Sequence, residues 1–179
     1  MDSFDIPVEF SKTRHSDERG YFQERFSDSD YRKYSFRNFV QENTSVSRLG
    51  VVRGWHWQLP PFAQEKLVTC FRGRVLDACL DIRVQSPSFG QIYTFELSPK
   101  TLNSVWIPIG FAHAFQALEE DSMILYSVTA EYNLQNSRTI CPLDDALPIQ
   151  WPIQNLILSK VDTEAPPMRA IPPEELFNF

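Results

Sequence analysis

The chain has 179 residues, of which 42% are hydrophobic and 13% aromatic, and its formal net charge is −6. This length predicts a single domain over residues 1–179 with a sizeable core. The acidic balance argues against general binding to nucleic acid, which needs a basic surplus. No apolar run approaches the roughly 20 residues that span a bilayer, so we expect no membrane association.

The N-terminal stretch, Met1 to Phe10, lacks the basic cluster and apolar core of a secretory signal, so no signal peptide is expected. The cysteines, Cys70, Cys79 and Cys141, are odd in number and have no paired spacing. This pattern fits a reducing compartment and offers no zinc motif. The sequence therefore predicts a cytoplasmic protein.

Short strands dominate the predicted elements. A short helix is expected at residues 28–34, capped by Ser27 or Asp28. Runs rich in Val, Ile, Phe, Tyr and Thr then predict strands at residues 66–71, 75–82, 92–97, 104–107 and 123–129. Residues 135–145 are predicted as loop, and a second short helix is expected at 173–177. Short strands at this spacing predict a mainly β protein, a sandwich or a barrel.

Two of the three histidines have matched surroundings. His56 ends the segment Gly50-Val-Val-Arg-Gly-Trp-His56, and His113 ends Pro108-Ile-Gly-Phe-Ala-His113. Each follows an apolar turn that contains glycine, and such placement can direct both side chains into one barrel. His15 lies in a polar stretch and is interpreted as a loop residue.

A metal site is the first alternative for two inward histidines. Metal-binding cupins typically carry Gly-x5-His-x-His-x3,4-Glu and Gly-x5-Pro-x-Gly-x2-His, and this chain matches both only in part. Gln58 occupies the ligand position after His56, and the glutamate position is not met, so the metal shell is incomplete. We expect a cupin-like barrel without a metal, in which His56 is free for acid–base chemistry.

Several cations and one polar segment are further candidates for binding. Arg19, Arg53 and Lys66 are interleaved with glycines and aromatics; a solvated surface explains any one of them, but the arginine fork also suits a phosphate or diphosphate. The segment from Gln41 to Ser47 is polar on both faces. It fits equally a solvated edge strand and a groove that hydrogen-bonds a base or sugar.

Two tyrosines complete the candidates. Tyr126 lies in an apolar run, where a tyrosine either needs a partner for its hydroxyl or acts as an acid that faces His56. Tyr132, six residues on, is expected at the mouth of the barrel, where its ring can stack on a ligand.

Nine motifs, spread in one order over most of the chain (residues 17–168), resemble the dTDP-4-dehydrorhamnose 3,5-epimerase family, the nucleotide-sugar epimerases of the cupin superfamily. They are Asp17-x-Arg-Gly-x-Phe-x-Glu24, Gln41-x-Asn-x-Ser-x-Ser47, Gly50-Val-Val-Arg-Gly-x-His56, Gln64-x-Lys-Leu-Val68, Asp77-x3-Asp-x-Arg83, Ser86-Pro-Ser-Phe-Gly90, Ile107-Pro-x-Gly-Phe-Ala-His113, Ile149-x-Trp-Pro152 and Leu158-Ser-x2-Asp162. Any one alone is weak, but nine in the order of the family are specific.

The resemblance implies a cupin-like double-stranded β-helix (jelly-roll) barrel with a few short helices. It also implies epimerisation at C3, C5 or both of a dTDP-linked 4-keto-6-deoxy sugar, as in rhamnose-type deoxysugar biosynthesis. By the same resemblance, His56 is the base, Asp162 its partner, Tyr126 the acid and Lys66 the group near the C4 oxygen. No cofactor or metal is expected, because only protons move.

The resemblance further implies a set of substrate-binding residues: Arg19, Phe22, Glu24, Gln41, Asn43, Arg53, His113 and Tyr132. In the family the first three reach the pocket of a second subunit. We therefore expect a homodimer to which residues 1–40, approximately, contribute.

The chain departs from the usual family pattern at several positions. Trp55 replaces a leucine and Ala114 a glycine, while Ser127 and Glu131 stand where lysine and tyrosine are frequent. The sequence leaves open whether Trp55 and the methyl group of Ala114 reshape the pocket, and with it which sugar is used and how many centres are inverted. The alternatives are an epimerase for a single centre of another deoxysugar, a metal-dependent cupin, and a non-catalytic module that binds a nucleotide sugar.

Overall fold

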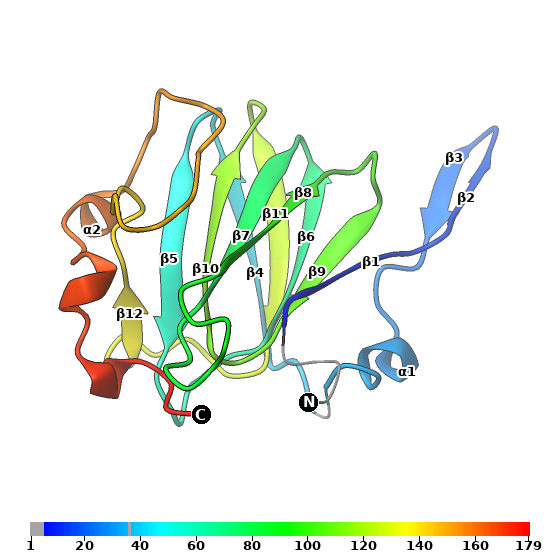
Figure 1. Ribbon diagram of the computed structural model, residues 1–179. Coiled ribbons are helices and arrows are strands. Elements are labelled where there is room, and N and C mark those ends of the chain that lie inside the picture. Colours follow the sequence, from blue (N-terminus) through cyan, green and yellow to red (C-terminus); the bar gives the residue numbers. More distant parts are fainter. Residues whose placement is uncertain (1–5, 36) are drawn as a thin grey trace.

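Two five-stranded antiparallel sheets form the body of the protein in a computed structural model that describes residues 6–35 and 37–179 (Figure 1). The first sheet has the order β1 (Val8–Ser11), β9 (Asn103–Ile107), β6 (Lys66–Arg72), β11 (Ser122–Val128) and β4 (Gln41–Ser47). The second has the order β12 (Ser137–Thr139), β5 (Val52–Gln58), β10 (Phe111–Ala117), β7 (Val75–Asp81) and β8 (Ile92–Leu97).

One core lies between the two sheets. Apolar side chains from β6, β9 and β11 of the first sheet meet those from β7, β8 and β10 of the second. Fully burying an aliphatic or aromatic side chain is worth about 1.5–3 kcal/mol, so this cluster holds the sheets together. Its members are Val68, Cys70, Val75, Cys79, Leu97, Val105, Ile107, Phe111, Phe115 and Ile124.

A second core covers the outer face of the second sheet. The segment after β12 runs back over that face and carries α2 (Lys160–Thr163) and the 3-10 turns η1 (Met168–Ala170) and η2 (Pro173–Glu175). Trp55 of β5 packs there against Trp151, with ring centroids 6.0 Å apart. Strand β10 is therefore buried along its whole length, and β5 is buried on the face that carries Trp55.

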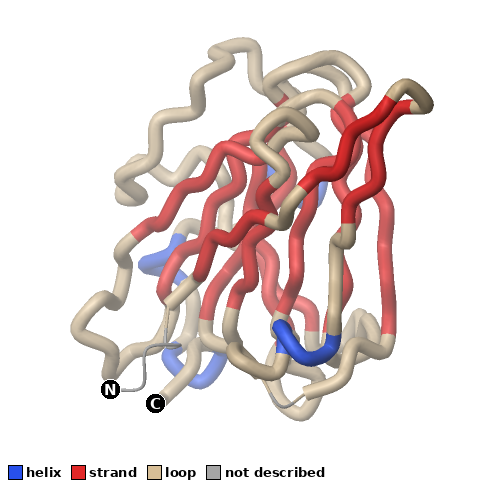
Figure 2. Tube along the Cα trace, turned by 90° about the vertical axis from the view of Figure 1, so that its right-hand side faces the viewer, coloured by secondary structure: helices blue, strands red, loops and turns tan. Residues whose placement is uncertain are grey.

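The N-terminal region extends away from this body. Strands β2 (Arg14–Asp17) and β3 (Gly20–Gln23) form a separate two-stranded hairpin that projects beyond the sheets (Figure 1). The short helix α1 (Asp28–Tyr31) follows, and Tyr31 packs with Leu67 and Trp106 on the outer face of the first sheet. Figure 2 shows that strands dominate and that the helices are short. No helix within residues 6–35 and 37–179 is long and apolar enough to cross a membrane.

The five predicted strands agree with the structure, whereas the predicted helices and one predicted loop differ from it. All five strands are confirmed within one or two residues, whereas the predicted helices shrink to Asp28–Tyr31 and the 3-10 turn Pro173–Glu175. The loop prediction at 135–145 is wrong in part, because it contains β12. This strand has three polar residues and no apolar alternation, so its pairing with β5 has no local signal.

Gly54 allows strand β5 to approach strand β10 closely. Substitution of this glycine tests how much the close packing of the two strands contributes to stability. Its φ is +124°, and an added Cβ would lie 2.4 Å from the Ala114 Cβ. We expect Gly54→Ala to destabilise the protein by about 1–3 kcal/mol because the strands must separate. Chemical denaturation measures the change in the free energy of unfolding.

The matched control is Gly90→Ala, since Gly90 also has a positive φ, of +79°, but no atom within 4 Å of the added Cβ. An equal loss in both variants would attribute the effect to backbone conformation alone and reject the packing argument.

Candidate active site

A cavity of about 660 Å³ is lined by residues of β4, β5, β6, β10, β11, β12 and α2. It brings together nine of the twelve residues that the sequence singles out, from both sheets and the C-terminal segment. They are Gln41, Asn43, Arg53, His56, Lys66, His113, Tyr126, Tyr132 and Asp162.

His56 and Asp162 form a hydrogen-bonded dyad. Asp162 Oδ1 lies 2.7 Å from His56 Nε2, and the Ser159 hydroxyl donates a hydrogen bond to Asp162 Oδ2 at 2.8 Å. Burial alone would raise the pKa of Asp162, but the hydrogen bonds from His56 and Ser159 hold it below its ordinary value. The carboxylate therefore stays ionised and accepts the Nε2 proton, which leaves the Nδ1 lone pair of His56 available as a base.

His113 is held by a second carboxylate. Its Nε2 lies 2.7 Å from Oδ2 of Asp77, which is fully buried on β7. His113 and His56 are directly opposite each other in the β10–β5 pair, so the two imidazoles line the same part of the cavity. The prediction that both histidines enter one barrel is confirmed by this register.

Asp77 is a polar partner to which the sequence motifs assigned no role. The available signal was a carboxylate within an apolar run predicted as a buried strand, because a buried charge needs a partner. That partner could not be named, since His113 is 36 residues away along the chain.

Lys66 is a buried cation beside the dyad. Its Nζ donates a hydrogen bond to the backbone oxygen of His56 at 3.2 Å. Burial lowers the pKa of Lys66 to about 8, although Cys79 and Asp77 act in the opposite direction. The side chain is mostly protonated at neutral pH and places a positive charge at the cavity wall.

Tyr126 faces the cavity from β11, which belongs to the sheet opposite His56. Burial raises the pKa of its phenol, with Arg53 opposing, so the hydroxyl keeps its proton at neutral pH. Within the described part of the chain this hydroxyl has no hydrogen-bond partner. Of the two interpretations of an interior tyrosine, the absence of a structural partner favours the acid.

Strand β4 satisfies both interpretations that its polar sequence allowed. It is the edge strand of its sheet, and alternate residues face opposite sides. Gln41 and Asn43 line the cavity and are joined by a hydrogen bond of 2.8 Å from Gln41 Nε2 to Asn43 Oδ1. Gln41 Oε1 accepts the backbone N–H of Tyr132 at 2.8 Å, which fixes the loop at the cavity mouth.

Arg53 of β5 lines the cavity near the C-terminal end of β4. Its Nε donates a hydrogen bond to Ser47 Oγ at 3.2 Å. No acidic side chain forms an ion pair with Arg53 among residues 6–35 and 37–179. The guanidinium is therefore positioned to receive an anionic ligand.

Arg19, Phe22 and Glu24 lie outside the cavity of their own chain. Arg19 pairs with Asp17 at 2.5 Å and Glu24 with Lys12 at 2.7 Å. Phe22 is 71% exposed on the projecting hairpin. The structure thus separates these three predicted binding residues from the other nine.

The structure answers where Trp55 and Ala114 lie: neither lines the cavity. Both belong to the core beneath the C-terminal segment, on the face of the second sheet that points away from the cavity. Trp55 directly precedes His56, and successive side chains of a strand point to opposite faces. The pairing of β5 with β10 is irregular between His56 and Arg53, and both of these residues line the cavity.

Gln58, at the position of a cupin metal ligand, is engaged elsewhere. Its amide nitrogen donates to the backbone oxygens of Phe62 and Glu131 at 2.8 and 3.1 Å, and its oxygen accepts the Asn133 N–H at 2.6 Å. No group of three or more His, Cys, Asp or Glu side chains in the described residues is arranged to hold a metal ion. Position 58 holds loops in place.

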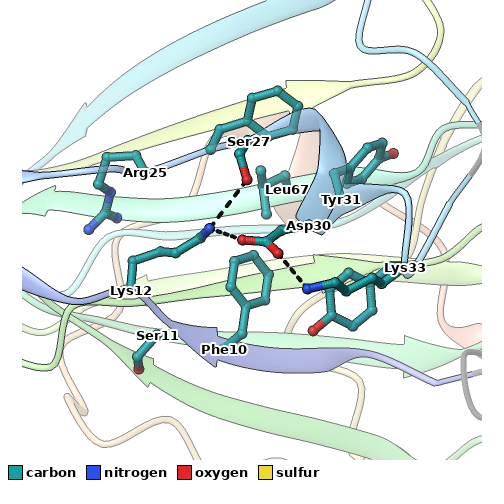
Figure 3. A pocket seen from close by; sticks show the side chains of 11 residues that line it. Phe10, Ser11, Lys12, Arg25, Ser27, Asp30, Tyr31, Lys33 and Leu67 are labelled. Carbon is teal, nitrogen blue, oxygen red and sulfur yellow. Dashed lines mark hydrogen bonds and ion pairs between the residues drawn. The ribbon is translucent and has the colours of Figure 1, made fainter.

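A smaller cavity of about 210 Å³ lies beside α1, outside the site (Figure 3). Lys12 contacts Asp30 and lies 3.5 Å from the Ser27 hydroxyl, while Lys33 pairs with Asp30 at 2.5 Å. Both lysines are thus engaged by the one carboxylate of the lining, and Arg25 is a further cation there.

Residues 5–170 match the sequence profile of the family described as dTDP-4-dehydrorhamnose 3,5-epimerase. The chain belongs to this family. It is therefore an isomerase, as the nine motifs predicted. A dTDP-4-dehydrorhamnose 3,5-epimerase from Sinorhizobium fredii is 42% identical over 157 residues, which cover 86% of this chain and 80% of the relative.

Solved structures of the family have the same fold. A dTDP-6-deoxy-D-glucose-3,5-epimerase from Legionella pneumophila, crystallised with dTDP-4-keto-L-rhamnose, matches with a TM-score of 0.94 and 36% identity over 99% of this chain and 95% of that one. A 3'-monoepimerase from Streptomyces bikiniensis, in complex with dTDP-quinovose, matches with a TM-score of 0.87 and 30% identity over 93% of this chain and 86% of that one. The predicted cupin-like fold is confirmed.

The depressed pKa of Asp162 predicts how the dyad affects stability. A carboxylate of this kind stabilises the fold above its unfolded pKa, about 3.9, and the stabilisation is lost as the pH falls through the folded pKa. Asp162→Asn should therefore lower the free energy of unfolding by about 1–3 kcal/mol at pH 7, and the difference from wild type should shrink below about pH 4.

Urea denaturation across the pH range provides the measurement, with the exposed Asp145→Asn as control. A pH of about 2.5 lies more than one unit below the unfolded pKa. A deficit in the free energy of unfolding of Asp162→Asn that stays constant down to this pH would contradict a role for the ionised carboxylate.

Proposed function

We propose that the protein epimerises a dTDP-linked 4-keto-6-deoxy sugar at C3 and C5, as a dTDP-4-dehydrorhamnose 3,5-epimerase. The observation that carries the proposal is the arrangement of two proton-transfer groups on opposite walls of one cavity. His56, held by Asp162, lies on one sheet, and a half-buried Tyr126 without a structural partner lies on the other.

The first step is removal of a proton beside the ketone. Hydrogens at C3 and C5 are acidic because the C4 carbonyl delocalises the resulting charge. Nδ1 of His56 takes the proton, and the nearby carboxylate of Asp162 stabilises the imidazolium that forms. A positioned base of this kind contributes typically about 10²–10⁴-fold to the rate.

The charge that develops on the C4 oxygen needs a fixed cation or donor. Lys66 of β6 is buried and mostly protonated at neutral pH, and His113 of β10 faces the same cavity from the opposite sheet. We assign them to this oxygen because preorganised charge in a water-poor site stabilises an enolate without reorganisation. Asp77 holds the ring of His113 in place.

The second step returns a proton to the opposite face of the same carbon. Tyr126 keeps its phenolic proton because burial raises its pKa. Donation from the wall opposite His56 inverts the centre, and exchange with solvent restores both groups. Only protons move in this scheme, so the chemistry requires neither a redox cofactor nor a metal.

The other polar side chains that line the cavity suit the nucleotide. Arg53 offers a guanidinium to the diphosphate, while Gln41 and Asn43 offer amides to the base or the deoxyribose. Tyr132, 58% exposed at the cavity mouth, is assigned to stack on the thymine ring.

We also propose that the protein is a single domain that works as a cytoplasmic homodimer. The support is the projecting β2–β3 hairpin, whose residues Arg19, Phe22 and Glu24 lie outside the cavity of their own chain. In a dimer they complete the site of the partner. The free thiols of Cys70, Cys79 and Cys141 suit a reducing compartment. No nucleic acid or membrane partner is proposed.

A single-centre epimerase is the second candidate. It is favoured by the match to the Streptomyces bikiniensis 3'-monoepimerase, which has the same fold. The two candidates share the dyad and differ only in how many carbons of the sugar reach His56.

Incubation with dTDP-4-keto-6-deoxyglucose in D2O, followed by NMR, tests both candidates. Deuterium at C3 and C5 is expected, because each inverted centre takes its new proton from an exchanged group. Label at one carbon identifies a single-centre enzyme. An unlabelled sugar would contradict the proposed function.

The matched control is His56→Asn, which removes the base while keeping a polar side chain of similar size. It should incorporate no deuterium, yet bind dTDP with a Kd within roughly threefold of wild type, since the residues assigned to the nucleotide, Gln41, Asn43, Arg53 and Tyr132, are unchanged.

A further inference from the structure

Ser159 lies on the cavity wall and contacts the carboxylate oxygen that His56 does not use. Its hydroxyl donates to Asp162 Oδ2 at 2.8 Å, while Asp162 Oδ1 lies 2.7 Å from His56 Nε2. The same Ser159 oxygen accepts the backbone N–H of Asp162 at 3.1 Å, which caps α2. One hydroxyl thus fixes both the backbone and the side chain of Asp162.

We propose that Ser159 is a positioning residue of the dyad, which orients the Asp162 carboxylate toward His56 and sets how strongly the dyad holds its proton. The inference rests on the proposed function, because it takes His56 as the base. Ser159 contacts the reacting atoms only through Asp162 and His56.

Because Asp162 is buried, water cannot readily replace the Ser159 hydroxyl as a hydrogen-bond donor to its carboxylate. Asp162 is 3% exposed, so bulk water has little access to the oxygen that Ser159 serves. The other charged groups that act on it are His56 and Arg53, both on β5. On α2 itself, Lys160 and Glu164 lie 3.8 Å apart, and their side chains are mostly exposed.

Loss of the hydroxyl therefore has a predictable sign. A carboxylate with fewer hydrogen-bond donors is a stronger base, because hydrogen bonds to the charged form favour that form. The imidazole and the carboxylate titrate as one pair, so the pair would hold its proton to higher pH. The base would then be available only above a higher pH than in the wild type.

The capping role must be separated from the role at the carboxylate. Glycine is tolerated at the N-cap position far better than alanine, so Ser159→Gly removes the hydroxyl with a small effect on the helix. Ser159→Thr keeps a hydroxyl for both contacts. Thr163→Ala removes a different contact of the same turn, the 2.9 Å hydrogen bond from Thr163 Oγ1 to the Ser159 backbone oxygen, without touching Asp162.

The experiment measures kcat and kcat/KM against pH with dTDP-4-keto-6-deoxyglucose as substrate. Ser159→Ala and Ser159→Gly should lower kcat roughly tenfold to hundredfold, as expected for a lost hydrogen bond to a charged group. The acidic limb of kcat/KM should move up by about one pH unit. Ser159→Thr and Thr163→Ala should keep the wild-type profile.

Wild-type kcat and an unmoved acidic limb in both Ser159→Ala and Ser159→Gly would overturn the inference. So would a loss of kcat without movement of the limb, or an equal loss in Thr163→Ala, because each of these identifies a capping role alone. If the wild-type enzyme incorporates deuterium into its substrate but the Ser159 variants keep the wild-type kinetics, only this inference is rejected. A wild-type enzyme that leaves the substrate unlabelled rejects the proposed function itself.

Discussion

The hydrogen bond between His56 and Asp162 joins a central strand of the second sheet to a short helix 106 residues later in the chain. Removing a carboxylate from water is costly unless donors replace the lost solvation, and Asp162 receives such donors from His56 and Ser159. The helix that carries Asp162 is part of the segment that covers the outer face of this sheet. The dyad therefore exists only when the C-terminal segment is packed in place.

This packing also explains why the two sheets have different roles. The C-terminal segment covers the outer face of the second sheet and so supports the backbone of β5 and β10 beneath the two histidines. The first sheet presents Tyr126 and the amides of β4 across the cavity. A base on one wall and an acid on the other give a ligand between them two faces with different chemistry, which is what inversion of a carbon centre requires.

Sequence patterns were informative where a residue acts through its own strand. Runs rich in β-branched and aromatic residues located five of the strands, and the matched settings of His56 and His113 anticipated that they share one cavity. Local patterns could not pair Asp77 with His113, because that contact spans 36 residues and two strands. They also missed β12, whose three polar residues form a strand only through pairing with β5.

Trp55 shows a different limit of sequence reasoning. A change of residue beside His56 suggested a change of pocket, but strand alternation sends the two side chains to opposite faces of the sheet. Asp162 was linked to His56 only through family resemblance, since no spacing rule joins residues so far apart. The family motifs located these residues, whereas the dependence of the dyad on the C-terminal segment became visible only in the fold.

The central claim is that one wall removes a proton and the other returns it. Tyr126→Phe, incubated with dTDP-4-keto-6-deoxyglucose in D2O and followed by NMR, separates these two steps. Deuterium exchange should persist through His56, while inverted product should fall by about 10²–10⁴-fold because the acid is missing. Inversion by Tyr126→Phe at the wild-type rate would contradict the account.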